Sequence, residues 1–136
     1  MKYFNLYKMK KLLFLPLLLI SCFCFAQNAK AIIGNPYRIG NLEIAQYDFA
    51  KYMYSDQAKK ACRGLGVGWR LPTKSELNIL YRNKSKIKIG GYSYNFYWGD
   101  NEDMDYPVMR QNFSNGEQEV VYEDDRMRVR AVRTIR

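Results

Sequence analysis

The first 26 residues determine how much of this 136-residue chain is available to fold. A basic leader without acidic residues precedes an apolar run over residues 12–20, and the segment ends at the small residue Ala26. This order is typical of a secretory signal peptide. The apolar segment is shorter than the ~20 residues that cross a bilayer, and Pro16 interrupts it. The sequence therefore predicts that residues 1–26 are a signal peptide and that the protein is exported.

Two processing chemistries fit the end of this leader. Cleavage after Ala26 would leave Gln27 as the new N-terminus and release the protein into the periplasm or the medium. Alternatively, residues 19–22 (Leu-Ile-Ser-Cys) resemble a bacterial lipobox, in which acylation of Cys22 would anchor the domain to a membrane and give a cell-surface protein. Phe23 is bulkier than the residue that lipoproteins usually carry there, which favours free secretion.

Removal of the leader leaves a mildly basic chain with one thiol. The leader holds four lysines and no acid, so the formal charge of +9 falls to +5, which does not indicate a nucleic-acid partner. The sequence has no histidine, which excludes Ser-His-Asp triads, Cys-His dyads and histidine-ligated zinc. Cys62 is the one cysteine after residue 26, so the exported domain is expected to fold without an internal disulfide.

The next residues predict a spacer over residues 27–36 and a single domain over residues 37–136. Alternation of apolar and polar residues from Leu42 to Gln46 predicts a short strand. A helix is expected to follow, capped by Ser55 or Asp56 and ended by the glycines at 64–68. Because these glycines follow a helix and not a strand, they do not indicate a phosphate-binding loop. The inward face of this helix is predicted to hold Ala58, Ala61, Cys62 and Leu65, with Cys62 as a small buried hydrophobe.

A second helix has the clearest local signal. Thr73 and Glu76 form a capping-box pattern directly after Pro72, and an apolar face of Leu77, Leu80 and Tyr81 follows, with an end expected near Asn83.

The last third of the chain has the period-two pattern of strands. An aromatic strand is expected over residues 92–98, with Tyr92, Tyr94, Phe96 and Trp98 on one face. Residues 108–113 and 117–122 are predicted to form a hairpin through a two-residue turn at Asn115-Gly116, and residues 127–131 a closing strand. Two helices followed by a small, mostly antiparallel sheet define an α+β domain.

The segment Gly-Trp-Arg-Leu-Pro-Thr-Lys-Ser-Glu-Leu at residues 68–77 resembles the signature of the Lcl C-terminal domain-like family. It is also similar to bacterial major paralogous domain proteins and to the sulfatase-modifying-factor group. The likeness extends to residues 58–62, 89–91, 97–98 and 129–133. It implies a C-type-lectin-like fold. Many members carry Tyr-Trp-Ser-Ser-Thr-Glu where this chain has Tyr-Trp-Gly-Asp-Asn-Glu at residues 97–102.

The signature itself is interpreted as a fold-building segment. Large apolar side chains in it are expected to be buried, and its arginine is expected to pair with a carboxylate or with helix-end carbonyls. The fold-defining residues are Trp69, Arg70, Leu71, Pro72, Thr73 and Glu76.

Two clusters of charge are candidates for ligand contacts. An acidic loop offers hard oxygen ligands for calcium, with a solvated loop as the alternative and no other cofactor predicted; its candidate metal ligands are Asp100, Glu102, Asp103 and Asp105. Near the C-terminus, arginines at 126, 128, 130, 133 and 136 either form a basic ridge for anionic groups or pair across strands with Glu117, Glu119 or Glu123.

These features favour a secreted or cell-surface binding or adhesion module, whose ligand is an extracellular glycan or protein. The resemblance to Lcl implies sulfated glycans as one ligand class. A sulfatase-modifying-factor-like enzyme is disfavoured, because such enzymes use a pair of thiols, and a structural envelope protein without a specific ligand is the remaining alternative. The candidate ligand-binding residues are Tyr97, Trp98, Asp100, Asn101, Arg128 and Arg130.

Overall fold

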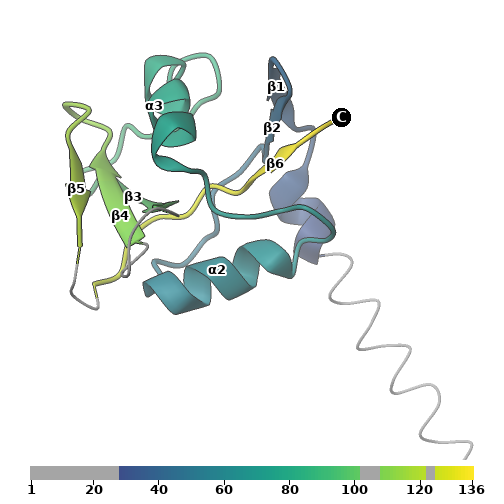
Figure 1. Cartoon of the computed structure of the whole chain (residues 1–136), viewed down its shortest axis with the longest axis horizontal. Helices are drawn as coiled ribbons and strands as arrows, with labels where there is room; N and C mark the ends of the chain where they lie inside the picture. Colours follow the sequence, from purple (N-terminus) through teal and green to yellow (C-terminus); the bar gives the residue numbers. More distant parts are fainter. Residues whose placement is uncertain (1–27, 102–107, 122–124) are drawn as a thin grey trace, which may run out of the picture.

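The computed structural model describes residues 28–101, 108–121 and 125–136 (Figure 1). The expected signal peptide, the lipobox cysteine Cys22 and the loop acids Glu102, Asp103 and Asp105 lie outside the described residues. Within the described ranges, no helix has the length and apolar character needed to cross a membrane.

The domain is α+β, as the sequence predicts. Residues 28–33 are helical, in the segment expected as a spacer, and Ala29, Ile32 and Ile33 pack against the core. The strands form two antiparallel three-stranded sheets, ordered β1-β2-β6 and β3-β4-β5, where one small sheet was expected. The remaining elements are β1 (Tyr37–Ile39), β2 (Leu42–Ile44), α2 (Ser55–Arg63), α3 (Lys74–Arg82), β3 (Phe96–Asp100), β4 (Val108–Asn112), β5 (Gln118–Val120) and β6 (Val132–Thr134).

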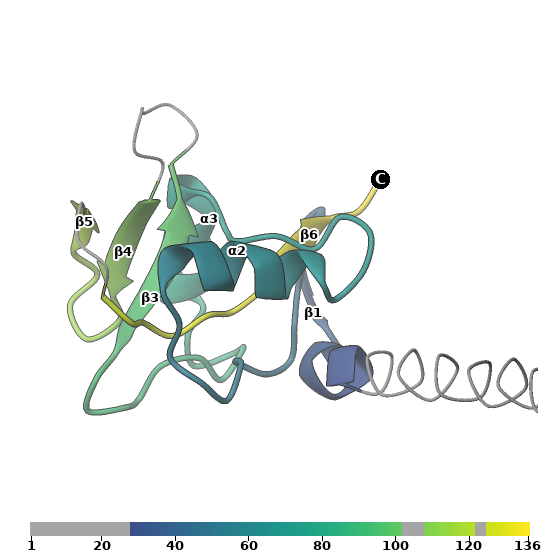
Figure 2. The ribbon, with the colours of Figure 1, turned by 90° about the horizontal axis from the view of Figure 1, so that it is seen from below.

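Two helices cover the two sides of a central layer (Figures 1 and 2). On one side, Ala58 and Cys62 of α2 pack with Trp98 of β3. On the other side, Leu77 and Leu80 of α3 pack with Tyr97, the neighbouring residue of β3. Consecutive strand residues point to opposite faces, so both faces of β3 are buried. The predicted alternation is confirmed for Phe96 and Trp98 on one face and Tyr97 on the other, but the strand begins at Phe96 and not at residue 92.

The closing strand is also placed differently from the prediction. Residues 127–131 make isolated bridges to Met53 and Tyr97, and the regular strand β6 begins only at Val132. Met127, Val129 and Ala131 are buried as their alternation predicts, but Arg130 between them is buried too, at 3% exposure. A similar exception occurs in β2, where Glu43 is buried and its Oε1 accepts a hydrogen bond of 2.7 Å from Arg133.

Helix α2 confirms the predicted boundaries to within one residue. It starts one residue after Tyr54, which is the N-cap in place of Ser55 or Asp56, and it ends at the C-cap Gly64. Ala58 and Cys62 have no exposed surface. Burial raises the pKa of the Cys62 thiol to about 12, so this side chain stays a neutral thiol, as expected of a small buried hydrophobe.

Helix α3 confirms the predicted capping box. The Thr73 hydroxyl accepts a hydrogen bond from the Glu76 amide at 3.3 Å, and the Thr73 amide donates to Glu76 Oε2 at 2.8 Å. Arg70 completes the arrangement with two hydrogen bonds to the Glu76 carboxylate, of 2.7 and 2.8 Å. Partial burial by itself would raise the pKa of Glu76, but the hydrogen bonds from Arg70 and Thr73 outweigh it and the pKa is lowered. Trp69 and Leu71 of the same segment are buried, as predicted.

Replacing the cap residue in Thr73→Ala should lower the free energy of unfolding by about 1 kcal/mol, because one N-terminal amide of α3 loses its acceptor. Urea denaturation measures this change. Ser75→Ala is the matched control, because Ser75 is exposed in the same helical turn. Equal destabilisation by the two variants would contradict the cap assignment.

The predicted hairpin between β4 and β5 forms, with Gln111 opposite Gln118. Its turn is wider than the expected two-residue turn. The Asn112 amide donates to the Glu117 carbonyl at 2.8 Å, and the Gly116 amide donates to the Asn112 carbonyl at 2.7 Å. The loop therefore spans residues 113–116, which leaves Phe113 free to enter the core.

Candidate functional site

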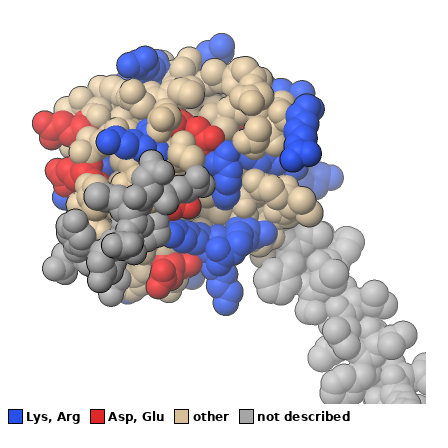
Figure 3. Space-filling view, in the orientation of Figure 1, with Lys and Arg blue, Asp and Glu red and all other residues tan. Residues whose placement is uncertain are grey.

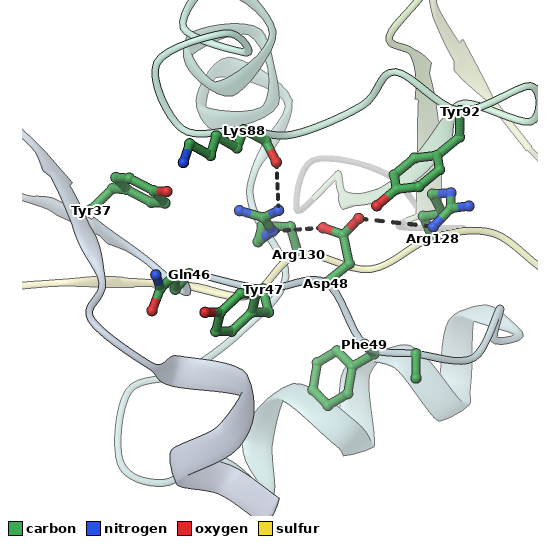
Figure 4. A pocket seen from close by; sticks show the side chains of 10 residues that line it. Tyr37, Gln46, Tyr47, Asp48, Phe49, Lys88, Tyr92, Arg128 and Arg130 are labelled. Atoms are coloured by element: carbon green, nitrogen blue, oxygen red, sulfur yellow. Dashed lines mark hydrogen bonds and ion pairs between the residues drawn. The ribbon is translucent and has the colours of Figure 1, made fainter.

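A cavity of about 480 Å³ opens beside the chain that leaves β2 (Figure 4). We call it the Asp48 cavity, after the carboxylate at its floor. Its volume lies within the ~300–1,000 Å³ range of small-molecule sites. It is lined by Tyr37, Gln46, Tyr47, Asp48, Phe49, Ala50, Lys88, Tyr92, Arg128 and Arg130.

The Asp48 carboxylate collects hydrogen bonds from two buried donors. Its Oδ1 accepts from Arg130 Nε at 2.6 Å, and its Oδ2 accepts from the Tyr97 hydroxyl at 2.7 Å. The Tyr97 oxygen in turn accepts a hydrogen bond of 3.1 Å from the Gly90 amide. Burial, followed by the negative charge of Asp48, raises the pKa of Tyr97 well above its ordinary value, so the phenol remains a donor.

Arg130 forms the floor of the cavity and is fully engaged by the protein. In addition to Asp48, its Nη1 donates to the carbonyl oxygens of Ala45 and Ile87 at 3.1 and 3.4 Å. Its Nη2 donates to the Lys88 carbonyl at 3.3 Å. This guanidinium therefore fixes three segments of chain to one another, and its own exposed surface is too small to be the main contact of a ligand.

Arg128 holds a second guanidinium nearer to the solvent. It is stacked on the ring of Tyr92, 3.4 Å from the ring centroid, and lies 4.8 Å from the ring centroid of Tyr52. Its Nη2 donates to the Tyr52 hydroxyl at 2.7 Å, and its Nη1 lies 4.0 Å from Asp48 Oδ2. Such stacking orients a guanidinium while leaving its charge available to an anion.

The rim of the cavity carries exposed aromatic rings and one further cation. Tyr47 and Tyr92 are 52% and 49% exposed. Lys88 has a left-handed backbone, with φ of 51°, and its ammonium group makes no ion pair or hydrogen bond with any residue in the described ranges. A strained backbone held in a cavity wall is a common mark of a binding site. In Figure 4 the Lys88 side chain extends along the opening toward Tyr37.

The lining has an excess of positive charge. Three cations, Lys88, Arg128 and Arg130, outnumber the single carboxylate of Asp48, which gives a formal charge of +2. The surface charge of the domain is also uneven. Figure 3 shows basic side chains over α2 and toward β6, and acidic ones mainly on the side of β4 and β5.

The structure brings together only some of the predicted ligand residues. Arg128 and Arg130 line the cavity, and Tyr97 reaches it through Asp48. Trp98 is 1% exposed, and its indole N–H donates to the Met53 carbonyl at 2.7 Å, so it belongs to the core.

Asp100 lies elsewhere, 3.7 Å from Lys59, and Asn101 does not line the cavity. The described residues contain no cluster of three acidic or thiol groups able to hold a metal ion. Calcium binding by the acidic loop stays a prediction, because Glu102, Asp103 and Asp105 lie outside those residues.

The exposed ridge, one of the two interpretations of the C-terminal arginines, does not describe Arg128, Arg130 and Arg133. Arg128 and Arg130 turn toward Asp48, and Arg133 pairs with Glu43 at 2.7 Å. Of the expected cross-strand partners, Glu119 pairs with Arg110 at 2.8 Å instead. Glu123 lies outside the described residues.

Sequence reasoning missed Asp48, Lys88 and the rim tyrosines. Asp48 stands 82 positions from Arg130, in a segment without a periodic pattern. The left-handed conformation of Lys88 has one sequence signal, the glycines that follow it at 90 and 91, which indicate an irregular loop.

Comparison with known proteins does not assign the chain to a class. A scan against protein-family models finds no matching family, and a search of curated proteins finds no matching relative.

Proposed function

We propose that this protein is an exported bacterial binding module with a C-type-lectin-like fold, which binds an acidic saccharide in the Asp48 cavity. One observation carries the proposal: a tyrosine-rimmed cavity with a net positive lining. The fold assignment is supported by the short sheets, by the pairing of β2 with β6 near the two ends of the domain, and by the cap-forming segment of residues 68–77.

Each part of the cavity suits a different part of an acidic saccharide. The guanidinium of Arg128 and the ammonium of Lys88 complement a carboxylate or sulfate group. The exposed rings of Tyr47 and Tyr92 offer flat amphipathic surfaces of the kind that recognition sites favour. The floor adds an acceptor, Asp48, for a ligand hydroxyl.

An enzyme of the sulfatase-modifying-factor type has weaker support. That chemistry needs a pair of accessible thiols, whereas Cys62 is buried with a raised pKa. The proposed export has its own test, the mass of the N-terminus of the protein recovered from its host. A start at Gln27 supports free secretion, and a diacylglyceryl mass on Cys22 supports anchorage.

Lys88→Asn should weaken binding to polygalacturonate and to heparin by roughly tenfold, since a free cation at the rim is lost. Asparagine tolerates the left-handed backbone at this position, so the loop should keep its shape. Affinity is measured by isothermal titration at low salt, because screening weakens exposed charge pairs. Lys74→Asn is the control with the same charge change, because Lys74 is exposed on α3 and does not line the Asp48 cavity.

Two results would count against the proposal. Equal losses in the Lys88 and Lys74 variants would show attraction by net charge alone. Absence of binding to both glycans at low salt would favour a structural envelope protein without a specific ligand.

A further inference from the structure

A second cavity of about 550 Å³ adjoins the Asp48 cavity, and the two share Lys88 and Tyr92 as lining residues. We call the second one the Ser114 cavity. Because one lysine and one tyrosine line both, the two cavities are neighbours on either side of that pair. Together they form a path longer than either cavity alone.

The Ser114 cavity is polar and has no acidic lining residue. Lys84 places its ammonium 3.1 Å from the Phe113 carbonyl and 4.7 Å from the Tyr81 ring centroid, so its charge is held in place. Ser85 and Ser114 contribute exposed hydroxyls. This combination of fixed positive charge and hydroxyl groups matches an anionic ligand that also carries hydroxyls.

The wall of the Ser114 cavity is open because it is built from glycine. Gly90 and Gly91 have φ of 84° and 80°, and a Cβ atom at Gly90 would lie 3.1 Å from Asn95 Oδ1. No atom lies within 4 Å of a Cβ built at Gly91. The glycine pair therefore lets the chain turn at the wall of the Ser114 cavity without adding a side chain that would narrow it.

We infer that the two cavities are subsites of one groove, and that the ligand is an acidic oligosaccharide of several units, not a single sugar. This inference rests on the proposed function. One acidic unit would occupy the Asp48 cavity, and the next units would cross the Lys88 and Tyr92 pair into the Ser114 cavity. An acidic peptide is the less favoured occupant, because the Ser114 cavity offers hydroxyls and charge and few apolar contacts for peptide side chains.

The test measures the affinity for ligands of increasing length. It then repeats the measurement on a variant with a negative charge introduced into the Ser114 cavity. The purified protein is titrated with galacturonate monomer, dimer and hexamer, and with sulfated galactose oligomers of the same lengths, which separates carboxylate from sulfate recognition. Affinity should rise with length. Ser114→Glu should weaken hexamer binding by roughly tenfold and leave monomer binding unchanged, because a single unit in the Asp48 cavity does not reach the added carboxylate. Ser75→Glu, an exposed serine on α3, should change neither.

Each other outcome overturns a defined part of the inference. Equal effects of Ser114→Glu on monomer and hexamer, or no effect on either, would refute the second subsite, and a loss of binding in Lys88→Asn would still support the proposed function. Failure of every oligomer to bind would refute both. Tighter binding of a polyaspartate peptide than of the hexamer, with the same dependence on Ser114, would reassign the groove to acidic peptides. Thermal melts of each variant establish that it is folded.

Discussion

Asp48→Ala is expected to lower the free energy of unfolding by about 3–5 kcal/mol, because it leaves the buried Arg130 guanidinium without its counter-charge. Arg130 is 3% exposed and binds Asp48 at 2.6 Å. The Tyr97 hydroxyl loses its acceptor in the same variant. Urea denaturation followed by tryptophan fluorescence measures the change. Ligand affinity should fall as well, since the floor of the cavity is removed.

The control for this prediction is the double variant Asp48→Ala, Arg130→Met. A buried ion pair replaced as a whole by apolar groups often costs little, whereas removal of one partner is costly. The double variant should therefore be more stable than the sum of the two single changes predicts. Additive losses would show that the two side chains contribute independently and would contradict the coupling.

Trp98→Ala is expected to lower the free energy of unfolding by about 3–5 kcal/mol, because a large buried side chain is replaced by a cavity. The loss of the indole N–H bond to the Met53 carbonyl adds to the effect. Saccharide affinity of the folded protein, measured at low temperature, should stay within about a factor of two. A large fall in affinity without destabilisation would show that Trp98 contacts the ligand, as the sequence analysis predicted. Trp98→Phe keeps most of the volume and should cost less than the alanine change.

The parts of the fold that the sequence predicted depend on local signals. Thr73 and Glu76 are three residues apart, and their side chains accept hydrogen bonds from amides at the start of α3. This arrangement does not depend on contacts with distant parts of the chain. The glycines after α2 are a similar local signal, because Gly66 has φ of 133°, a conformation that does not continue the helix. The burial of both Tyr97 and Trp98 depends on two helices that approach β3 from opposite sides, which a period-two pattern cannot show.

The candidate site was predictable only in part, for the same reason. Arg128 and Arg130 were recognisable as an arginine cluster, but their common partner Asp48 is brought to them by tertiary structure. The burial of Arg130 and the pairing of both arginines with Asp48 were therefore not predicted. The sequence offered an exposed ridge or cross-strand pairs, and the structure has a buried Arg130 at the floor with Arg128 stacked on Tyr92 nearer to the solvent.

Residues at the floor of the Asp48 cavity contribute to both folding and ligand recognition, whereas residues at its rim contribute to recognition alone. Changes at Asp48 or Arg130 alter folding and recognition together, so these positions have little freedom to vary. Tyr47, Lys88 and Tyr92 are exposed, and substitutions there should alter recognition with little loss of stability. A library that varies only these three positions should thus yield folded proteins with new ligand preferences.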